Sequence, residues 1–362
     1  MTTIGIIGAG QLGQMLGEAG RSLGVDCVFM DPSDNPPAAS AGKVLKFAYD
    51  SAEGLAALAN TSDLITYEFE NVPVDALSKL PPSLRVYPPA AALEHAQDRL
   101  VEKNLFRSLG IPLPGFRAVD SADDLRAAAK ELGLPIVLKT RRFGYDGKGQ
   151  AVIRNEDEID EAVEALGGKQ LIAEQFVAFD REVSAIGVRS STGEIAHYPL
   201  TENVHRDGIL HTSTAPADGD HLEQPARDYV ESLLTRLDYA GVLALELFVT
   251  GDRLLANEFA PRVHNSGHWT IEGAQTSQFE NHLRAILGMP LGATAVRGCA
   301  GMINLIGTIP ADRGPFELAG RSLHDYGKAA RPGRKLGHVT IVSENGDVRN
   351  KILEELANHL NS

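Results

Sequence analysis

The chain opens with a short apolar segment that leads directly into a glycine-rich turn and a helical pattern. Residues 3–7 (TIGII) predict a buried strand, and the residues that follow (GAGQLG) match the pattern G-x-G-x-x-G. Apolar residues then recur at helical spacing as far as Leu23 and Gly24. A strand, a tight turn and a helix in this order indicate an open α/β sheet at the N-terminus.

Two interpretations of this turn stay open. Asp31 ends the next apolar segment about 20 residues after the turn, where a dinucleotide-binding protein holds a ribose. This spacing suggests NAD, so a dehydrogenase is one alternative. However, glycines in such a turn only bring a helix N-terminus close to an anion, which suits any small phosphate ester. They also permit close packing of the helix on the strand.

The composition restricts the possible partners. With 34 Lys and Arg residues against 48 Asp and Glu residues, the formal net charge is −14, which repels nucleic acids and acidic membrane surfaces. We find no signal-peptide pattern, and no segment reaches the ~20 apolar residues of a membrane span. Cys27 and Cys299 are too few for a disulfide framework. We therefore expect a cytoplasmic protein without nucleic-acid or membrane partners.

The length and the residue pattern predict more than one domain. At 362 residues, 43% of them hydrophobic, the chain is long enough for two or three domains. The open α/β pattern covers residues 1–98, and its third strand, near residues 63–69, ends in Glu68 and Glu70. A proline-rich segment at residues 80–89 suggests a boundary, and residues 90–109 predict one continuous helix.

A second glycine-rich segment has the character of a phosphate-binding loop. Residues 137–150 (VLKTRRFGYDGKGQ) predict a strand that ends near Lys139, followed by a loop with three glycines and Lys148. Glycines leave the backbone free to fold over phosphates, and the two ammonium groups can neutralise charge on a transferred phosphoryl group. The spacing is not that of a P-loop. A glycine-rich hairpin with solvated lysines is the alternative.

Two glutamates stand in neighbouring apolar segments, residues 242–249 and 254–259, which predict the strands of a hairpin. Glu246 and Glu258 are an even number of residues apart. We expect a loop of odd length centred on Asp252, which would place both carboxylates on one face with Cβ atoms ~5 Å apart. A two-residue loop would place them on opposite faces. Like charges this close need a cation, and Mg²⁺ binds carboxylates together with phosphate oxygens.

Two further segments gather polar side chains. After Glu258 the chain carries Arg262, whose planar fork suits a carboxylate-like anion, with His264 and Asn265 as further donors. Residues 328–335 add a run of cations in an acidic protein, which predicts a pocket for a phosphate. The alternatives are loop-capping hydrogen bonds and a solvated basic loop.

In this order, the motifs GAGQLGQML, KTRRFGYDGKGQ, EQFV, NEFAPRVHNSGHWT and YGKAARPGRKLGHVT resemble the 5-(carboxyamino)imidazole ribonucleotide synthase family of the ATP-grasp superfamily. The resemblance covers nearly the whole chain and implies an α/β protein with an ATP-grasp fold. Residues 1–98 would form a Rossmann-like preATP-grasp domain, residues 99–178 the small lobe with its linker helix, and residues 179–362 the large lobe. A small C-terminal segment, residues 296–362, would pack on the large lobe.

The resemblance also implies a reaction. Members of this family use ATP to carboxylate 5-aminoimidazole ribonucleotide with bicarbonate, which gives ADP, phosphate and 5-carboxyamino-1-(5-phospho-D-ribosyl)imidazole in de novo purine biosynthesis. ATP phosphorylates bicarbonate to carboxyphosphate, with Mg²⁺ as the cofactor, and the amine then attacks carboxyphosphate or the carbon dioxide released from it. Members are usually homodimers.

Carried over position by position, the resemblance assigns residues to each ligand. ATP would be surrounded by Arg99, Lys139, Gly144, Tyr145, Asp146, Gly147, Lys148, Gly149, Gln150, Glu174, Gln175, Phe176, Val177, Glu182, His205, Asn257 and Glu258, with Glu246 and Glu258 as magnesium ligands. The catalytic residues would be Asp146, which orients or deprotonates the amine, and Arg262, His264, Asn265 and Lys328. The ribonucleotide would contact Gln11, Leu12, Glu68, Tyr145, Lys328 and Arg334.

The sequence departs from the family pattern at Phe143, Val263 and Trp269, which adjoin the polar groups of the site. Three other functions stay open: an ATP-grasp ligase with a different acceptor, an NAD-dependent dehydrogenase, and a nucleotide-binding regulator without catalysis. The first would share Lys139, Glu246 and Glu258 but differ at Gln11, Lys328 and Arg334.

Overall fold

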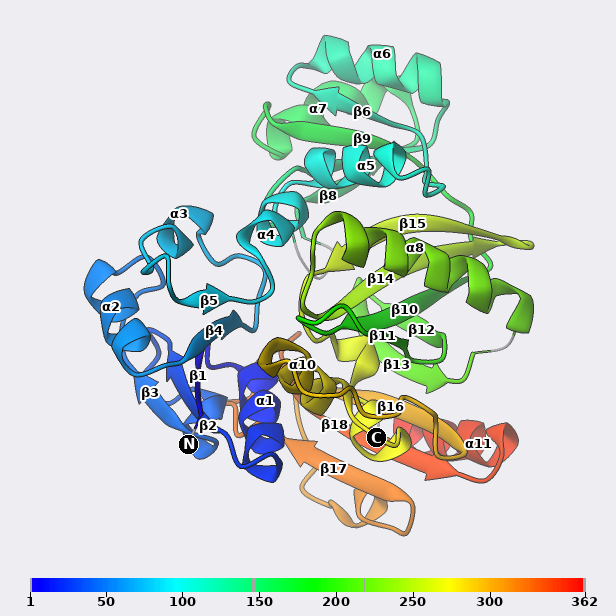
Figure 1. Ribbon diagram of the computed structural model, residues 1–362. Helices are drawn as coiled ribbons and strands as arrows, with labels where there is room; N and C mark the ends of the chain where they lie inside the picture. The colour runs from blue at the N-terminus through cyan, green and yellow to red at the C-terminus, as the bar shows by residue number, and fades with distance from the viewer. Residues whose placement is uncertain (1, 145–147, 218, 361–362) are drawn as a thin grey trace.

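The computed structural model describes residues 2–144, 148–217 and 219–360. Three sheets organise this part of the chain: a five-stranded sheet, a four-stranded sheet and a nine-stranded sheet. In Figure 1 the first lies in the blue region at the left, the second in the lobe at the top, and the third in the green to red body. The expected α/β fold with an N-terminal Rossmann-like region is confirmed.

The first sheet is parallel throughout, with the strand order β3-β2-β1-β4-β5. Its strands are β1 (Thr3–Ile7), β2 (Asp26–Met30), β3 (Lys43–Leu45), β4 (Leu64–Tyr67) and β5 (Arg85–Val86), and its helices are α1 (Gln11–Ser22), α2 (Ala52–Asn60) and α3 (Val74–Leu77). Ile6 and Ile7 are both fully buried although they belong to hydrophobic clusters on different sides of the sheet. A parallel sheet covered on both faces explains the unbroken apolar run at the start of the sequence.

The continuous helix expected over residues 90–109 is wrong. Two helices, α4 (Ala90–Ala96) and α5 (Arg99–Ser108), are separated at Asp98. The Asp98 side chain accepts hydrogen bonds from the backbone N–H groups of Leu100 and Val101 and so begins α5 as an N-cap residue. The break turns the chain toward the second sheet.

The four-stranded sheet is antiparallel, with the order β6-β9-β7-β8. It consists of β6 (Phe116–Val119), β7 (Ile136–Thr140), β8 (Gln150–Ile153) and β9 (Leu171–Gln175), and its helices are α6 (Ala122–Leu132) and α7 (Ile159–Ala165). Leu125 of α6 and Ile159 of α7 share one hydrophobic cluster with the strands. The glycine-rich segment joins β7 to β8, so its lysines lie at one end of this sheet.

The nine-stranded sheet has the order β15-β14-β10-β12-β13-β16-β18-β17, and β11 pairs with β10. Its strands are β10 (Arg181–Arg189), β11 (Ile195–His197), β12 (Thr201–Arg206), β13 (Ile209–Ala215), β14 (Gly241–Thr250), β15 (Arg253–Ala260), β16 (Cys299–Ile306), β17 (Arg321–Asp325) and β18 (Lys335–Ser343). The associated helices are α8 (Glu223–Arg236), α9 (Thr270–Gly273), α10 (Gln278–Leu287) and α11 (Gly346–Leu360).

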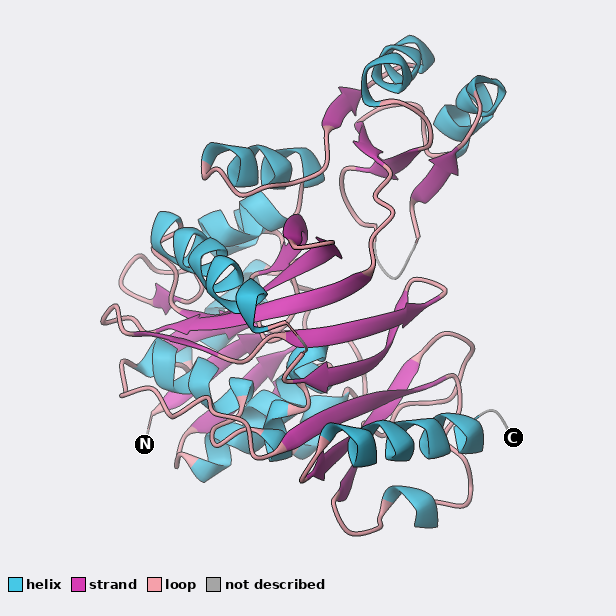
Figure 2. Ribbon diagram, turned by 90° about the vertical axis from the view of Figure 1, so that its right-hand side faces the viewer, coloured by secondary structure: helices cyan, strands magenta, loops and turns pink. Residues whose placement is uncertain are grey.

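The C-terminal segment extends this sheet rather than only packing on it. Strand β16 pairs antiparallel with β13, so the last three strands continue the sheet of the large lobe. Figure 2 shows α11 lying along this end of the sheet, and Leu353 and Leu356 pack with Ile303 and Val339 beneath it. Residues after 296 therefore share hydrogen bonds with the large lobe.

No helix within residues 2–144, 148–217 and 219–360 is long and apolar enough to cross a membrane. Cys27 and Cys299 are free thiols.

Candidate active site

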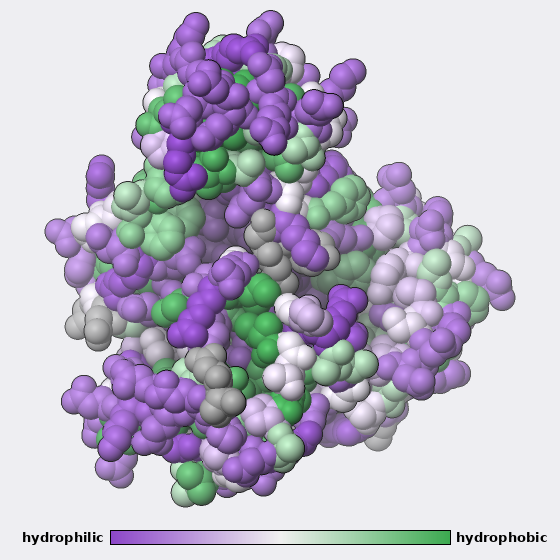
Figure 3. All heavy atoms as spheres, turned by 180° about the vertical axis from the view of Figure 1, so that it is seen from behind, coloured by the Kyte–Doolittle hydropathy of each residue, from purple (hydrophilic) through white to green (hydrophobic). Residues whose placement is uncertain are grey.

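A cavity of about 540 Å³ is lined by residues of the four-stranded and nine-stranded sheets together with Gln11 and Leu12 of α1. Figure 3 shows the surface hollowed beneath the upper lobe that carries the four-stranded sheet. From the predicted ATP set, the cavity is lined by Arg99, Lys139, Gly144, Lys148, Gln150, Glu174, Gln175, Phe176, Val177, Glu182, His205, Asn257 and Glu258. It is also lined by Glu246, Arg262, His264, Asn265, Gln11 and Leu12. The ligand-binding roles of these residues stay predictions.

The other predicted residues either fall outside the described part of the chain or are absent from the cavity lining within it. Tyr145, Asp146 and Gly147 lie outside the described residues. Gly149, Glu68, Lys328 and Arg334 are not among the described residues that line the cavity.

A network of buried charges forms the upper wall of the cavity. Glu174 on β9 accepts from Lys139 of β7 at 3.1 Å and pairs with Lys103 of α5 at 3.2 Å. Burial lowers the pKa of Lys139, although Glu174 opposes this shift. Burial would raise the pKa of Glu174, but Lys103 and Lys139 lower it to about 2. The carboxylate therefore stays ionised and holds Lys139 at the cavity.

The hairpin of β14 and β15 does not have the expected loop of odd length. Thr250 pairs with Arg253, so the loop contains two residues. Glu246 is nevertheless the register partner of Glu258, because the register shifts between Glu246 and Leu247. Leu247 pairs with Ala256, which leaves Asn257 as the extra residue of a β-bulge. The bulge compensates for the even loop, and both glutamates line the cavity as expected.

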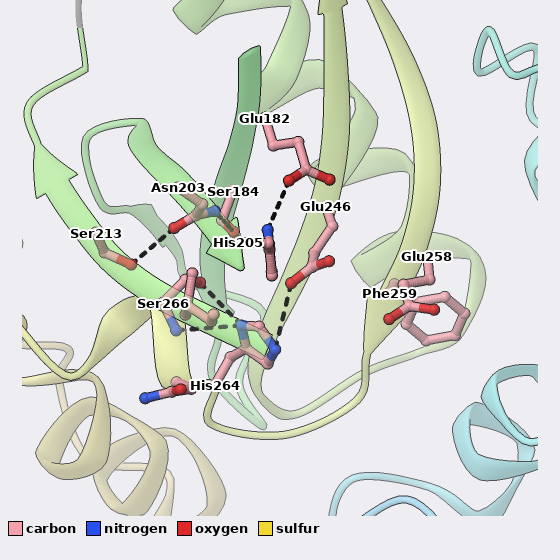
Figure 4. Close-up of polar contacts among 12 residues, drawn as sticks. Glu182, Ser184, Asn203, His205, Ser213, Glu246, Glu258, Phe259, His264 and Ser266 are labelled. Carbon is pink, nitrogen blue, oxygen red and sulfur yellow. Dashed lines mark hydrogen bonds and ion pairs between the residues drawn. The ribbon is translucent and has the colours of Figure 1, made fainter. Parts of the chain in front are cut away.

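The two carboxylates have different electrostatic environments. Burial and the charge of Glu258 raise the pKa of Glu246 to about 7. Burial also acts on Glu258, but Arg99, whose Nη1 lies 2.7 Å from Glu258 Oε2, holds the pKa of Glu258 well below its usual range. In Figure 4 the side chain of Glu246 lies beside the Glu182–His205 pair and reaches toward His264, whose Nε2 is 3.5 Å from Glu246 Oε1.

These groups fit a hard cation. Glu246 and Glu258 supply carboxylate oxygens, and Asn257 Oδ1 is buried without a hydrogen-bond partner among the described residues. Oxygen ligands of this kind are the ones that Mg²⁺ binds, together with phosphate oxygens and water. A cation between the two glutamates would also relieve the repulsion that raises the pKa of Glu246. Within the described residues, no group of three or more His, Cys, Asp and Glu side chains forms a complete metal site.

The pair of Glu182 and His205 adds a second titrating group to this wall. His205 Nδ1 lies 2.6 Å from Glu182 Oε2. Burial would lower the pKa of His205, but the hydrogen bond to Glu182 and the charge of Glu246 raise it. The hydrogen-bonded chain of Ser184, Asn203 and Ser213 supports the neighbouring strands from within the sheet.

The loop after β15 lies at the junction between the large sheet and the N-terminal sheet. Arg262 Nε donates to Glu70 Oε2 at 2.5 Å, and Glu70 raises the pKa of Arg262 although burial opposes this. Burial and Arg262 lower the pKa of His264 to about 3, so its ring is neutral at pH 7. Asn265 exchanges hydrogen bonds with Asn304 of β16 at 2.8 and 3.2 Å. This loop therefore presents a fixed cation and neutral donors to the cavity.

The glycine turn of α1 is already occupied by the protein's own carboxylates. Glu68 accepts from the N–H groups of Gly10 at 2.6 Å and Gly13 at 2.9 Å. Asp31 accepts from Ala9 N–H at 3.1 Å and is 5% exposed, so it does not present a carboxylate to a ribose. The glycine turn and Asp31, which suggested a dinucleotide site, therefore form hydrogen bonds within the protein.

Lys328 reaches the N-terminus of α1 from the far end of the sequence. Its Nζ donates to Gln11 Oε1 and lies 5.6 Å from the centre of the Tyr326 ring. Burial, followed by Arg334, lowers the pKa of Lys328 to about 8. Gln11 lines the cavity, so Lys328 contacts the cavity wall. Arg334 donates to the backbone oxygen of Ala329 at 3.2 Å.

Sequence reasoning missed several residues that support this site. Glu102 and Lys103 of α5 are 2% and 0% exposed. They lie four and three residues before the buried Phe106, so helical spacing already placed both on the buried face. Phe179 and Phe248 stack at 4.7 Å and line the cavity. Asp98 was hidden by the prediction of one continuous helix, although an Asp before an amphipathic segment is a typical N-cap signal.

Comparison with known families divides the chain into three matched regions. Residues 1–97 match the ribonucleotide synthetase preATP-grasp domain, and residues 104–279 match the ATP-grasp domain. Residues 300–351 match the phosphoribosylaminoimidazole carboxylase C-terminal domain.

Individual relatives are similar over nearly their whole length. The N5-carboxyaminoimidazole ribonucleotide synthase of Pseudomonas aeruginosa is 51% identical over 338 residues, which cover 93% of this chain and 94% of that protein. The crystal structure of N5-carboxyaminoimidazole ribonucleotide synthetase from Thermus thermophilus has a TM-score of 0.92 and 53% identity, covering 97% of this chain and 96% of the other. The enzyme of Aspergillus clavatus in complex with ADP and 5-aminoimidazole ribonucleotide has a TM-score of 0.92 and 31% identity, covering 99% and 98%.

Proposed function

Since this chain belongs to the N5-carboxyaminoimidazole ribonucleotide synthase family of ATP-grasp ligases, we propose that it carboxylates 5-aminoimidazole ribonucleotide at the expense of ATP. Bicarbonate is the proposed source of the carboxyl group, and the reaction serves purine biosynthesis. Structures of the Aspergillus clavatus enzyme with ATP, and with ADP and the aminoimidazole ribonucleotide, support both organic substrates.

One observation carries the proposal: a single cavity reaches from the nucleotide side to the N-terminus of α1. Lys139 of β7, Glu258 of β15, Arg262 of the loop after β15 and Gln11 of α1 all line it. A small oxyanion held by Arg262 would therefore have access to both a γ-phosphate and an amine. Such proximity is what a two-step transfer through an unstable intermediate requires.

In the first step a bicarbonate oxygen attacks the γ-phosphorus of ATP, the bond to the β-phosphate oxygen breaks, and ADP leaves. Lys139 and Arg99 place positive charge where charge spreads over the transferred phosphoryl group. Arg262 holds the bicarbonate. His264 is neutral and weakly basic, so it contributes a hydrogen bond without taking the proton of bicarbonate. Glu246 and Glu258 would hold Mg²⁺, which when bound neutralises phosphate charge as a Lewis acid.

In the second step the amine of the imidazole forms the new N–C bond. It attacks the carbonyl carbon of carboxyphosphate, with phosphate as the leaving group, or carbon dioxide formed by loss of that phosphate. The proton that the amine loses passes to the released phosphate. Gln11 and Lys328 would hold the ribonucleotide at the N-terminus of α1. Exclusion of water from this cavity during the reaction would protect carboxyphosphate from hydrolysis.

The test is an ADP-release assay in which bicarbonate and the aminoimidazole ribonucleotide are each omitted in turn. We expect rapid ADP release only with both present, and the carboxyamino product in equal amount. A regulator would bind ATP without bicarbonate-dependent turnover. An ATP-grasp ligase with another acceptor would release ADP only when that acceptor replaced the ribonucleotide. Either result would contradict the proposal.

We further propose that the protein is a cytoplasmic homodimer. The resemblance to a family whose members are usually homodimers supports the dimer, and the formal charge of −14, which repels acidic membranes and nucleic acids, supports the location. Analytical ultracentrifugation of the purified chain tests the dimer, and a sedimenting species of 38.8 kDa would contradict it.

A further inference from the structure

Strand β15, which carries Glu258, is the edge strand of the nine-stranded sheet. An edge strand has backbone N–H and C=O groups that no neighbouring strand pairs, and a bulge disturbs the pairing further. When such an edge is buried, these groups need other partners, since each unpaired buried group costs about 1–3 kcal/mol. Helix α5 and the segment after it cover this edge.

Three contacts fasten the bulged edge to this cover. Glu102 Oε1 accepts from the Phe259 N–H at 2.7 Å, and Lys103 Nζ donates to the carbonyl oxygen of Asn257. The carbonyl oxygen of Pro112 accepts from the Ala256 N–H at 2.7 Å. The first two contacts lie on either side of Glu258 in the sequence. They fix the backbone directly before and after this carboxylate.

Burying two ionisable side chains is costly unless they have specific partners. Glu102 is 2% exposed and Lys103 is fully buried, and Lys103 also pairs with Glu174 at 3.2 Å. Two apolar residues would fill the same volume without this cost but would leave the Phe259 N–H and the Asn257 carbonyl unpaired. Glu102 and Lys103 therefore supply the acceptor and the donor that the bulged backbone needs.

We propose that Glu102 and Lys103 are positioning residues that hold residues 257–259 so that Glu258 stays opposite Glu246. Glu102 also lines the cavity, but in this assignment both residues act through the backbone of β15 rather than on a substrate. The catalytic consequence rests on the proposed function, because only there do the two glutamates bind Mg²⁺ beside ATP. The positioning itself is a property of the ligand-free fold.

The test compares Glu102→Ala, which removes the acceptor, with Glu102→Gln, which keeps an oxygen at the same place. Lys103→Met removes the donor with little change in volume. The first readout is hydrogen exchange of residues 256–260 in the ligand-free protein, which we expect to accelerate in Glu102→Ala and Lys103→Met but not in Glu102→Gln. The second is magnesium-dependent ADP binding, which should weaken about 10- to 100-fold in the same two variants.

Both readouts are independent of the acceptor substrate, so a failure of the ADP-release assay would leave them interpretable. Leu356→Ala in α11 serves as the control for general destabilisation, because Leu356 is fully buried in a different cluster. It should lower the melting temperature without changing ADP binding. Unchanged ADP binding in Glu102→Ala, or equal losses in Glu102→Ala and Glu102→Gln, would overturn the proposal. If Glu102→Ala does not fold, rapid exchange of the Phe259 amide in the wild-type protein would also overturn it.

Discussion

The carboxylate of Glu68 accepts a hydrogen bond from the backbone N–H of Gly10 at a distance of 2.6 Å. Glu68 thereby takes the place at the N-terminus of α1 where a pyrophosphate is bound in dinucleotide-binding proteins. A Cβ atom at Gly10 would lie 2.7 Å from Glu68 Oε1, so the glycine is needed for the approach of the protein's own side chain. The fingerprint is therefore explained without a dinucleotide.

We predict that NADH does not bind at this turn. A pyrophosphate would have to displace Glu68 from two N–H groups and would meet a second carboxylate at Asp31. Fluorescence titration with NADH should show no saturable change, whereas ADP should bind in the same buffer. Saturable NADH binding that ADP does not displace would contradict this assignment.

The second prediction concerns Glu258→Gln. The substitution keeps the size of the side chain but removes a carboxylate from the pair with Glu246, so ADP release should fall ~100-fold or more. The far-ultraviolet circular dichroism should be unchanged. Arg99 loses its 2.7 Å partner in this variant, so the melting temperature also reports the loss of that ion pair.

Glu344→Gln is the matched control, because Glu344 is an exposed glutamate after β18. It should leave turnover within error of the wild type. Near-normal turnover in folded Glu258→Gln protein would rule out the metal assignment.

The third prediction is a pH dependence at Asp98. Arg141 Nη2 lies 2.7 Å from Asp98 Oδ2, and Arg141 lowers the pKa of Asp98 although burial opposes this. A carboxyl group with a lower pKa in the folded state stabilises the fold fully above its unfolded pKa, about 3.9, and loses this contribution as the pH falls through the folded value. Asp98→Asn keeps an N-cap oxygen but removes the charge. Its free energy of unfolding at pH 6 should fall by about 1–3 kcal/mol.

Urea unfolding at pH 6 and pH 3 measures this effect, and the variant should lose less stability than the wild type on acidification. Asp123→Asn is the control, because Asp123 forms an exposed pair with Arg126 at 2.9 Å. Its effect should stay below about 1 kcal/mol. An equal loss on acidification in Asp98→Asn and the wild type would contradict the prediction.

Local patterns sufficed for most strands, whereas most of the predicted cavity residues came from the family resemblance. The strand at Thr3–Ile7 has the predicted bounds, because the apolar run and the glycine that follows it act within one element. The break at Asp98 was missed, since an N-cap is decided by one side chain against a good helical pattern on both sides.

The bulge at Asn257 shows why the hairpin loop was predicted incorrectly. Leu254, Ala256 and Phe259 are the buried core positions of β15, so the spacing changes from two residues to three at the bulge. That change is present in the sequence, but Leu255 and Ala260 are also apolar and obscure it. The partners of the bulge, Glu102 and Lys103, are more than 150 residues away and follow only from tertiary structure.

The fourth prediction is that Lys328→Ala mainly raises the KM for the aminoimidazole ribonucleotide. Lys328 contacts Gln11 at the N-terminus of α1, away from the Lys139 side of the cavity. Loss of a remote phosphate contact weakens substrate binding more than the chemical step. Steady-state kinetics with each substrate varied should show a smaller change in the KM for ATP. A selective rise in the KM for ATP would mean that the two ligands are assigned to the wrong regions.

The last prediction follows from the ionisation of the same lysine. Burial and Arg334 lower the pKa of Lys328 to about 8, so its ammonium group is present below that pH and is lost as the pH rises through 8. The substrate phosphate carries its second charge above about pH 6. The KM for the ribonucleotide should therefore be lowest between these values and rise above pH 8. In Lys328→Arg the guanidinium keeps its proton, and the rise above pH 8 should disappear even if the KM at pH 7 is higher. The same alkaline rise in both proteins would show that another group titrates.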